Sequence, residues 1–371
     1  MIGTRPEAIK LAPVVRALRR SPRRFKPLVL LTSQHREMLR QTLRCFSLSG
    51  DHDFNIMRSN QDLSLLTAQI LRHLHAYIGR MAPDMVMVQG DTTTAFASAL
   101  TAFLAKIPVA HVEAGLRSSD SRNPFPEEMN RVLTDHLSEI LLAPTAQARI
   151  NLLSEGFAPS KITVTGNTVI DALKFFARKK VNRARSPLRR LDFSKMIILV
   201  TAHRRESFGR PLENICRALV VLARRLDGKA VFVYPVHPNP HVRKTVFRLL
   251  QKERNIVLLE PLDYDQFVHL MKSSHFIMTD SGGIQEEASY LGKPILVLRE
   301  KTERSEAVRY GNAQLVGTDP ETVVPAALSL FSDRTRYRAM ARARTIYGDG
   351  RASARIVRTL TRYFDMHSLP S

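Results

Sequence analysis

Residues 84–115, DMVMVQGDTTTAFASALTAFLAKIPVAHVEAG, decide the fold class of this chain. Two apolar runs of strand length, residues 84–88 and 108–112, flank a stretch of helical pattern at residues 92–105. A strand, a helix and a second strand in this order build a parallel sheet whose two faces are covered by helices. The stretch therefore predicts an α/β protein.

The same alternation continues along most of the chain. The further runs of strand length are residues 27–31, 139–143, 196–200, 230–234, 256–259, 276–278 and 294–298. Charge and proline interrupt the pattern at residues 181–195, VNRARSPLRRLDFSK, and we place a hinge within residues 166–195. Because a domain typically contains roughly 100–200 residues, we predict two doubly wound, Rossmann-like domains that face a cleft.

Composition narrows the class of protein. With 44% hydrophobic and 24% charged residues, the chain is expected to be soluble and globular. No apolar run approaches the roughly 18 residues of a membrane span, and no signal peptide precedes the first helix, so we expect a cytoplasmic protein. The two cysteines, Cys45 and Cys216, have no metal-ligand spacing and suggest no disulfide.

The chain is strongly basic. Lys and Arg outnumber Asp and Glu by 56 to 34, which gives a formal net charge of +22 and favours a polyanionic partner or an anionic small substrate. Basic residues are spread along the chain, with local runs only at residues 16–24 and 179–190, and no aromatic-interleaved nucleic-acid module accompanies them. We therefore expect an anionic small substrate, with most of the charge on a solvated face, and neither nucleic-acid nor membrane binding.

Polar residues follow the predicted strands, at the sheet edge where open parallel sheets bind ligands. After one strand, Ser281, Gly282 and Gly283 begin a predicted helix whose amides can hold a phosphate. About one turn along lie Glu286 and Glu287, where a carboxylate could accept both hydroxyls of a ribose. A plain tight turn is the alternative. The phosphate site and the nearby carboxylates together predict that a nucleotide binds here. Because the P-loop and Gly-x-Gly-x-x-Gly patterns are absent, we expect neither ATP hydrolysis nor NAD binding.

Several acids of the first half could carry chemistry. Asp91, Glu113 and the pair Glu127 and Glu128 lie on predicted loops, and His203 follows a strand of the second half. Such a set could move protons on and off a sugar carbon, with acid and base on opposite sides of the ring. Each residue also has a simpler interpretation, as a helix cap, a first-turn acid or a surface loop residue. Metal-ligand spacing is lacking, so no metal is expected.

The first ten residues, MIGTRPEAIK, predict a second phosphate site. Thr4 and Glu7 have the spacing of a capping box, with Pro6 in the first helical turn. A free helix N-terminus beside Arg5 and Lys10 would attract a phosphate. An ordinary capped amphipathic helix is the alternative.

Eight segments in one order over nearly the whole chain also carry a family resemblance. They are GTRPEAIKLAP, QGDTTTAFASALTAF, IPVAHVEAGLRS, PFPEEMNRVLTDH, GNTVIDAL, TAHRRESFG, YPVHPNP and TDSGGIQEEASYLGKPILVLREKTER. Together they closely resemble the non-hydrolysing UDP-N-acetylglucosamine 2-epimerases. The resemblance implies a glycosyltransferase-B type fold, with Rossmann-like domains at residues 1–168 and 169–350 and a C-terminal helix at 351–371 that returns to the first domain. It also implies a homodimer, a role in making cell-surface polysaccharide and no cofactor.

The implied reaction interconverts UDP-N-acetylglucosamine and UDP-N-acetylmannosamine, by anti elimination of UDP to 2-acetamidoglucal and syn re-addition. By motif, Asp91, Glu113, Glu127 and His203 are the implied proton-transfer and transition-state residues, supported by Arg131. The implied contacts to the substrate or its diphosphate are Arg5, Lys10, Ser281, Gly282 and Gly283, and Arg304 is an implied contact to the nucleotide. Glu287 is the implied contact to the ribose, and Leu262 and Phe267 are the implied contacts to the uracil.

The family also implies a regulatory UDP-N-acetylglucosamine site, for which the matches are Gln34, Gln61, Arg204 and His237. The segment SQHREML at this site favours the reversible epimerase over hydrolysing relatives that release N-acetylmannosamine. A glycosyltransferase of the same architecture is a further alternative, and a basic polyanion-binding protein is a third. One departure is that the family's first β-strand is here reduced to Met1 and Ile2, so this central strand is expected to be missing.

Overall fold

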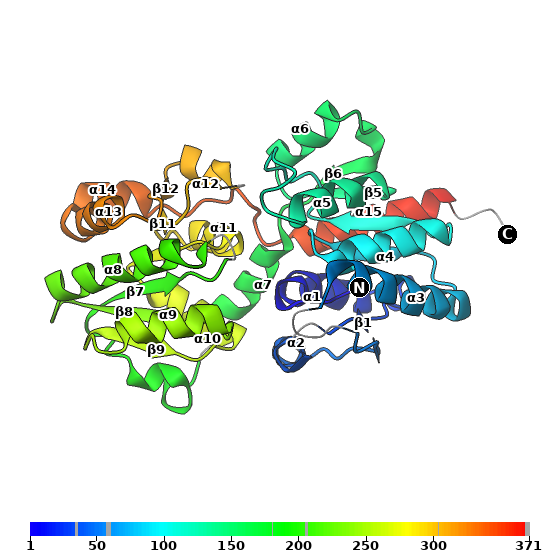
Figure 1. Cartoon of the computed structure of the whole chain (residues 1–371). Coiled ribbons are helices and arrows are strands. Elements are labelled where there is room, and N and C mark those ends of the chain that lie inside the picture. The colour runs from blue at the N-terminus through cyan, green and yellow to red at the C-terminus, as the bar shows by residue number, and fades with distance from the viewer. Residues whose placement is uncertain (34–35, 57–60, 180, 205–206, 303, 368–371) are drawn as a thin grey trace. The chain divides into compact units, whose positions relative to one another are not determined.

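The computed structural model describes residues 1–33, 36–56, 61–179, 181–204, 207–302 and 304–367. Contacts between Cα atoms divide the chain into two compact units (Figure 1). Unit 1 consists of Met1–Lys174 and Tyr347–Ser371, and unit 2 of Phe175–Ile346. Within the described residues, every helix is too short or too polar to cross a membrane. The domain boundaries given by the resemblance stay a prediction.

Unit 1 is built on a four-stranded parallel sheet in the order β3-β4-β5-β6. Its strands are β3 (Val86–Gln89), β4 (Val109–Val112), β5 (Ile140–Ala143) and β6 (Ile162–Val164). The connecting helices are α4 (Thr93–Leu104), α5 (Glu127–His136) and α6 (Ala146–Ser154). A separate two-stranded sheet pairs β1 (Leu30–Leu31) with β2 (His52–Asp53), near α2 (Arg36–Cys45) and α3 (Leu63–Met81) in sequence.

Met1 and Ile2 lie beside β1 and are also bonded to β3. The Ile2 amide donates to Leu30 O at 2.9 Å, and the Thr32 amide donates to Ile2 O at 3.1 Å. The Met1 amino group donates to Met87 O at 2.9 Å. These two residues therefore hold the position between β1 and β3 that the resemblance gives to the family's first strand.

The first and last helices of unit 1 pack against each other. Helix α1 (Arg5–Arg19) begins with the predicted capping box, which the structure confirms: Thr4 and Glu7 bond reciprocally. Helix α15 (Ala352–His367) packs on α1. Asp171, on α7 (Thr168–Ala177), accepts from the amides of Ala352 and Ser353 at 3.0 and 2.9 Å, which fixes the start of α15.

Unit 2 has a six-stranded parallel sheet in the order β12-β11-β10-β7-β8-β9. Its strands are β7 (Met196–Thr201), β8 (Ala230–Pro235), β9 (Ile256–Leu259), β10 (Phe276–Thr279), β11 (Ile295–Val297) and β12 (Ala313–Leu315). Numbered within the unit, this is the order 3-2-1-4-5-6 of the dinucleotide-binding sheet. The order reverses between β7 and β10, and such a switch point is where ligands bind in this fold.

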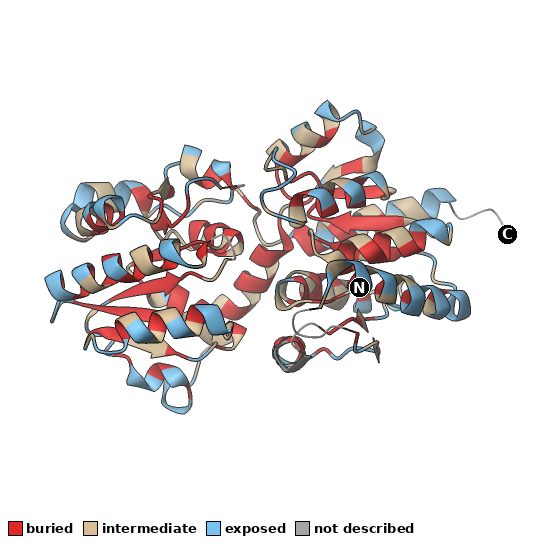
Figure 2. Cartoon of the chain, viewed as in Figure 1, coloured by how far each residue is buried: buried red, intermediate tan, exposed pale blue. Residues whose placement is uncertain are grey.

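The helices of unit 2 enclose this sheet, and Figure 2 shows its strands mostly in the buried colour. They are α8 (Arg210–Arg225), α9 (Pro240–Leu250), α10 (Tyr264–Ser273), α11 (Gly282–Tyr290), α12 (Ser305–Arg309), α13 (Pro320–Ser332) and α14 (Arg334–Met340). Short 3-10 turns occupy the charged segment before β7, at Arg183–Arg185 and Pro187–Arg190. The predicted α/β class is confirmed.

A glycine after β4 shapes the sheet edge in unit 1. Gly115 has a φ of +82°, and a Cβ there would overlap the Ala148 carbonyl oxygen and lie 2.8 Å from Leu152 Cγ. Gly156 has a similar φ of +86° but no atom within 4 Å of the corresponding position. A side chain at position 115 would therefore meet both an unfavourable backbone conformation and a steric clash, whereas one at position 156 would meet only the first.

We expect G115A to lower the free energy of unfolding by about 2–4 kcal/mol, because about 1–2 kcal/mol of left-handed strain adds to the cost of overpacking. G156A is the matched control, with the backbone strain alone. Denaturant unfolding of both variants measures the difference, and equal losses would contradict this account.

Candidate functional site

The candidate site of unit 1 lies at the carboxyl ends of β3 and β4. Gly90 and Asp91 follow β3, and Glu113 follows β4. Glu113 is 6% exposed and has a φ of +75°, a left-handed conformation that costs a non-glycine residue energy. The turn thereby directs an acidic side chain into the interior, which is a frequent use of backbone strain in functional sites.

Glu113 is the centre of a dense group of hydrogen bonds. Lys10, from α1, donates to both carboxylate oxygens at 2.8 and 2.6 Å. Gln89 donates to Oε2, and Asn167 donates to Oε1 at 3.1 Å. A buried carboxylate is costly without such partners. The structure thus brings two predicted site residues, Lys10 and Glu113, into one ion pair.

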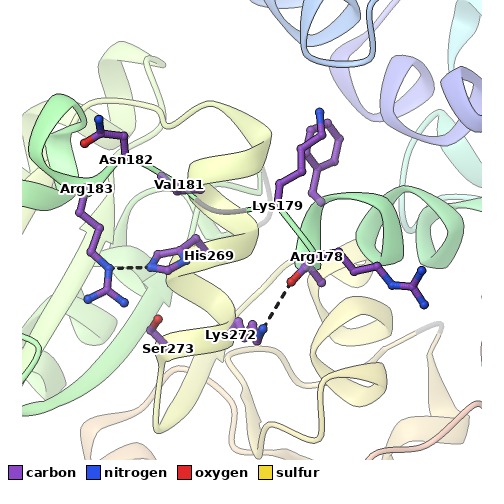
Figure 3. A pocket seen from close by; sticks show the side chains of 10 residues that line it. Arg178, Lys179, Val181, Asn182, Arg183, His269, Lys272 and Ser273 are labelled. Carbon is purple, nitrogen blue, oxygen red and sulfur yellow. Dashed lines mark hydrogen bonds between the residues drawn. The ribbon is translucent and has the colours of Figure 1, made fainter.

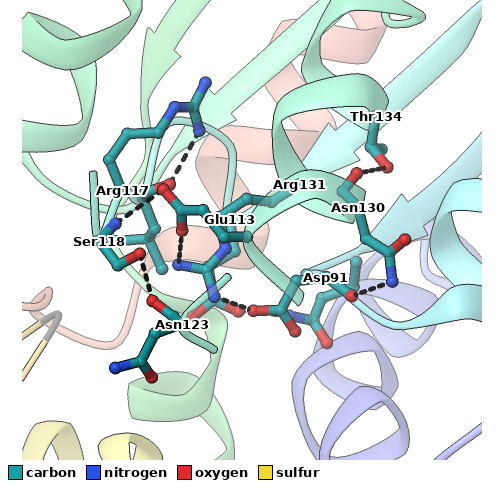
Figure 4. A network of polar contacts seen from close by, with 12 residues as sticks. Asp91, Glu113, Arg117, Ser118, Asn123, Asn130, Arg131 and Thr134 are labelled. Atoms are coloured by element: carbon teal, nitrogen blue, oxygen red, sulfur yellow. Dashed lines mark hydrogen bonds and ion pairs between the residues drawn. The ribbon is translucent and has the colours of Figure 1, made fainter. Parts of the chain in front are cut away.

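A second ion pair joins Asp91 to Arg131 of α5 (Figure 4). Arg131 is 4% exposed and also lies 3.1 Å from Glu128. Glu128 in turn accepts from the amides of Ser118 and Ser119 at 2.9 and 3.2 Å. In the described part of the chain, the Arg131 Nε atom is buried without a hydrogen-bond acceptor, while Nη1 is the atom that faces Glu128 Oε2. Arg131 therefore keeps donor capacity while its orientation is fixed.

Glu127, another predicted acid, is the first residue of α5 and is half-buried. The sequence left open whether Asp91 caps the following helix. The cap of α4 is Thr92, whose hydroxyl accepts from the Ala95 amide, so Asp91 is left for its pair with Arg131.

The expectation of a free N-terminus at α1 is wrong. The Glu7 Oε2 atom accepts from the amides of Gly3 and Thr4 at 3.0 and 2.6 Å, and Thr92 donates to Oε1 at 2.8 Å. Burial raises the pKa of Glu7, while these hydrogen bonds oppose the shift. The capping box that the sequence predicted therefore occupies the amides that were to bind a phosphate.

Below these loops lies a buried network around Asp135. Its carboxylate pairs with His111 at 2.6 Å and with Arg117 at 2.8 Å, and accepts from the Gly115 amide at 3.1 Å. The other ring nitrogen of His111 lies 2.8 Å from Gly90 O. The network therefore connects the loop after β3 to the loop after β4. Burial alone would raise the pKa of Asp135, but His111 and Arg117 lower it below its ordinary value.

The candidate site of unit 2 lies at the switch point between β7 and β10. Asp280 is fully buried after β10, and its Oδ2 accepts from the amides of His203 and Arg204, both at 2.8 Å. The Ser207 hydroxyl donates to the same oxygen at 3.1 Å. The His203 ring, 35% exposed, stacks on the His237 ring with centroids 5.1 Å apart. Asp280 thus fixes the loop that carries two predicted residues.

Helix α11 starts at this switch point. Its cap, Ser281, makes no side-chain capping bond, and its amide donates to the Thr279 hydroxyl at 2.9 Å. A Cβ on Gly283 would meet no atom within 4 Å. The first turn of α11 therefore has the open backbone that a phosphate site at a helix N-terminus requires.

The acids further along α11 are buried and partnered. Glu286 pairs with Arg304 at 2.6 Å, and Glu287 accepts a hydrogen bond from the Tyr264 hydroxyl. Of the predicted uracil contacts, Leu262 is buried ahead of α10 and Phe267 is half-buried on it.

The predicted regulatory residues that the structure describes belong to both units. Gln61, ahead of α3, donates to Gln69 at 2.7 Å. Arg204 and His237 lie after β7 and β8 in unit 2. Gln34 lies outside the described residues. In the described ranges, no group of three or more His, Cys, Asp or Glu side chains is placed to hold a metal ion.

Comparisons with known proteins agree on one family. The family model described as UDP-N-acetylglucosamine 2-epimerase matches residues 16–361. The chain belongs to this family. The UDP-N-acetylglucosamine 2-epimerase of Escherichia coli K12 is 50% identical over 367 residues, which cover 97% of each chain.

Solved structures of the 2-epimerase family agree with this assignment. The Neisseria meningitidis UDP-GlcNAc 2-epimerase bound to UDP-GlcNAc is 45% identical, with a TM-score of 0.94 over 97% of this chain and 98% of that one. The Methanocaldococcus jannaschii enzyme, in complex with UDP-GlcNAc and UDP, is 35% identical, with a TM-score of 0.85 over 97% and 98%.

Two residues of this 2-epimerase chain were not predicted as site residues: Asp280 holds the His203 loop, and Tyr264 bonds to Glu287. Glu128, which the sequence paired with Glu127 as a candidate acid, lies beside Arg131. Asp280 stands next to the predicted residue Ser281, so its motif gave a local signal. Tyr264 is 23 residues from Glu287, and nothing in the sequence pairs the two.

We expect D135N to lower the free energy of unfolding by about 2–3 kcal/mol at neutral pH, because His111 loses its buried carboxylate partner and Arg117 keeps only its second partner, Glu155. The pKa of Asp135 is lower in the folded protein than its ordinary value of 3.8, so its ionised carboxylate stabilises the fold at pH values above 3.8. This stabilisation is lost as the pH falls through the pKa of the folded state. The difference from the wild type should therefore shrink in acid.

The control is D365N, which breaks the exposed pair of Asp365 with Arg24 and should cost less than about 1 kcal/mol. Denaturant unfolding across pH measures both variants. A D135N deficit that stays constant down to strongly acidic pH would show that charge is not its cause.

Proposed function

We propose that this chain is a reversible UDP-N-acetylglucosamine 2-epimerase that produces UDP-N-acetylmannosamine. The observation that carries the proposal is the two carboxylate–cation contacts, buried Glu113 with Lys10 and half-buried Asp91 with Arg131, at the strand ends of unit 1. Support also comes from the Neisseria relative, whose structure holds UDP-GlcNAc. The proposed partner of the site is therefore this nucleotide sugar.

The proposed reaction has two steps. In the first, the bond from C1 to the diphosphate oxygen breaks and takes its electron pair to UDP, while a base removes the C2 proton, giving 2-acetamidoglucal. In the second, UDP adds again at C1 and a proton returns to C2 from the other face. Positive charge beside the reacting atoms favours this departure of an anion.

Asp91, Glu113, Glu127 and His203 form the proposed set for proton transfer and transition-state stabilisation. Arg131 supports the set, because it is buried, pairs with Asp91 and retains a donor at Nε in the described structure.

The nucleotide is proposed to bind in unit 2. The open first turn of α11, with Ser281, Gly282 and Gly283, would take the diphosphate. Glu287 would accept from the ribose hydroxyls, and Leu262 and Phe267 would contact the uracil. Arg5, Lys10 and Arg304 complete the proposed substrate contacts, by the family motif.

A second, regulatory UDP-N-acetylglucosamine molecule and a homodimer are proposed from the family resemblance alone. Gln34, Gln61, Arg204 and His237 are the residues assigned to the regulatory site.

Proton NMR of UDP-N-acetylglucosamine in heavy water tests the proposed reaction. We expect deuterium at C2 while UDP-N-acetylmannosamine accumulates, because the removed proton exchanges with solvent before re-addition. E113Q, which removes a buried charge at the site, should lower the rate at least about a hundredfold.

The NMR products also separate the alternatives. Release of UDP with free N-acetylmannosamine would replace the proposal with a hydrolysing epimerase. No exchange at C2, with sugar transfer to an added acceptor, would indicate a glycosyltransferase.

Y264F tests the proposed ribose contact. The Tyr264 hydroxyl is the donor to Glu287, so its loss should leave the carboxylate less well oriented and raise KM for UDP-N-acetylglucosamine about tenfold. The value of kcat should change little, because the ribose is remote from C2.

Steady-state kinetics measure this split, with Y363F of α15 as the control. A Y264F enzyme with normal KM would argue against Glu287 as a ribose contact.

A further inference from the structure

A cavity of about 720 Å³ in unit 2 is lined by none of the predicted site residues. It lies between the segment after α7 and the C-terminal end of α10 (Figure 3). The charged and polar side chains of its wall include Arg178, Lys179, Arg183, His269, Lys272 and Ser273. Among the described residues that line it, none carries a carboxylate. Its volume is in the range of small-molecule sites, roughly 300–1,000 Å³.

Arg183 is held in a fixed orientation at this cavity. Its guanidinium carbon lies 4.1 Å from the centroid of the Phe193 ring, and its Nε donates to His269 Nε2 at 2.8 Å. Figure 3 shows the guanidinium beside the His269 ring. Among the described residues, no carboxylate forms an ion pair with Arg183 or with His269. The two terminal nitrogens of Arg183 therefore offer the planar fork that binds phosphate in a bidentate manner.

Two lysines add positive charge to the same wall. Lys272 Nζ donates to Ala177 O at 3.3 Å, which uses one of its three hydrogens. Lys179 Nζ lies over the rings of Phe175 and Phe176, at 4.3 and 4.9 Å from the centroids. In the described part of the structure neither ammonium has an acidic partner. Arg178 points away from Arg183 in Figure 3 and contributes charge at longer range.

The titration of His269 agrees with an excess of positive charge. Burial lowers its pKa, and the neighbouring Arg183 and Lys272 lower it further. A neutral ring can accept the Arg183 hydrogen bond at Nε2, as observed. His269 therefore orients the guanidinium without adding a competing anion.

We infer that this cavity binds a small molecule through a diphosphate or triphosphate group, held by Arg183 and Lys272, with Lys179 adding charge at longer range. Unpaired cations beside a cavity favour an anion, and a planar, pre-oriented guanidinium favours phosphoryl oxygens. The inference also gives a role to the basic run at residues 179–190, which the proposed epimerase reaction does not use.

The test is calorimetric titration of the full chain with inorganic tripolyphosphate, in the presence of saturating UDP so that the nucleotide site is filled. We expect binding at one site, weakened about tenfold or more in R183Q and in K272Q. R189Q is the matched control, since Arg189 is an exposed residue of the same basic run, loses the same charge and does not line the cavity. It should bind as the wild type does.

Melting temperatures equal to the wild-type value would show that the variants are folded. No binding of tripolyphosphate to the wild type, or equal weakening by R183Q and R189Q, would overturn the inference. A DNA duplex could also displace tripolyphosphate from the protein. If R183Q and R189Q weakened the binding of that duplex equally, the inference would be overturned and the basic residues would be assigned to a nucleic-acid surface. None of these outcomes depends on epimerase activity.

Discussion

Unit 1 depends on one electrostatic constraint: a carboxylate withdrawn from water needs a cation or several donors beside it. The buried or half-buried pairs that satisfy it are Glu113 with Lys10, Asp91 with Arg131, and Asp135 with Arg117. In the first two pairs the cation comes from a helix, α1 or α5, and the acid from a loop that follows a strand. The same contacts that permit acids at the sheet edge therefore also fix the helices around it.

Unit 2 meets the constraint with a cation at Glu286, which pairs with Arg304, and with backbone amides at Asp280. Asp280 is surrounded by the amides of His203 and Arg204, and this arrangement closes the loop after β7 onto the end of β10. A backbone amide does not titrate in the ordinary pH range, and its position is fixed by the main chain, whereas a lysine side chain titrates and is flexible. The loop at the switch point is accordingly held by hydrogen bonds from its own main chain to Asp280.

Much of this architecture follows from periodicity, because buried parallel strands are continuous apolar runs. Strands β2, β6 and β12 escaped prediction because none of them lies in an apolar run of strand length, and β2 is the polar pair His52–Asp53. The acids after β3 and β4 were predictable from their position after strands. Their partners were not, because Lys10 lies 103 residues from Glu113 and only the folded chain brings them together. The free helix N-terminus failed for a related reason: a local capping carboxylate competes for the same amides as a ligand.

The hydrogen bonds of the two acids bear on which can accept a proton. Glu113 accepts four hydrogen bonds from three groups, Lys10, Gln89 and Asn167, and a carboxylate offers about four lone-pair sites. In this arrangement it can take a proton only if one of these donors moves aside. Asp91 is 33% exposed and is held by Arg131 at Oδ2. A base needs an accessible lone pair as well as a neighbouring cation, and the geometry around Asp91 supplies both.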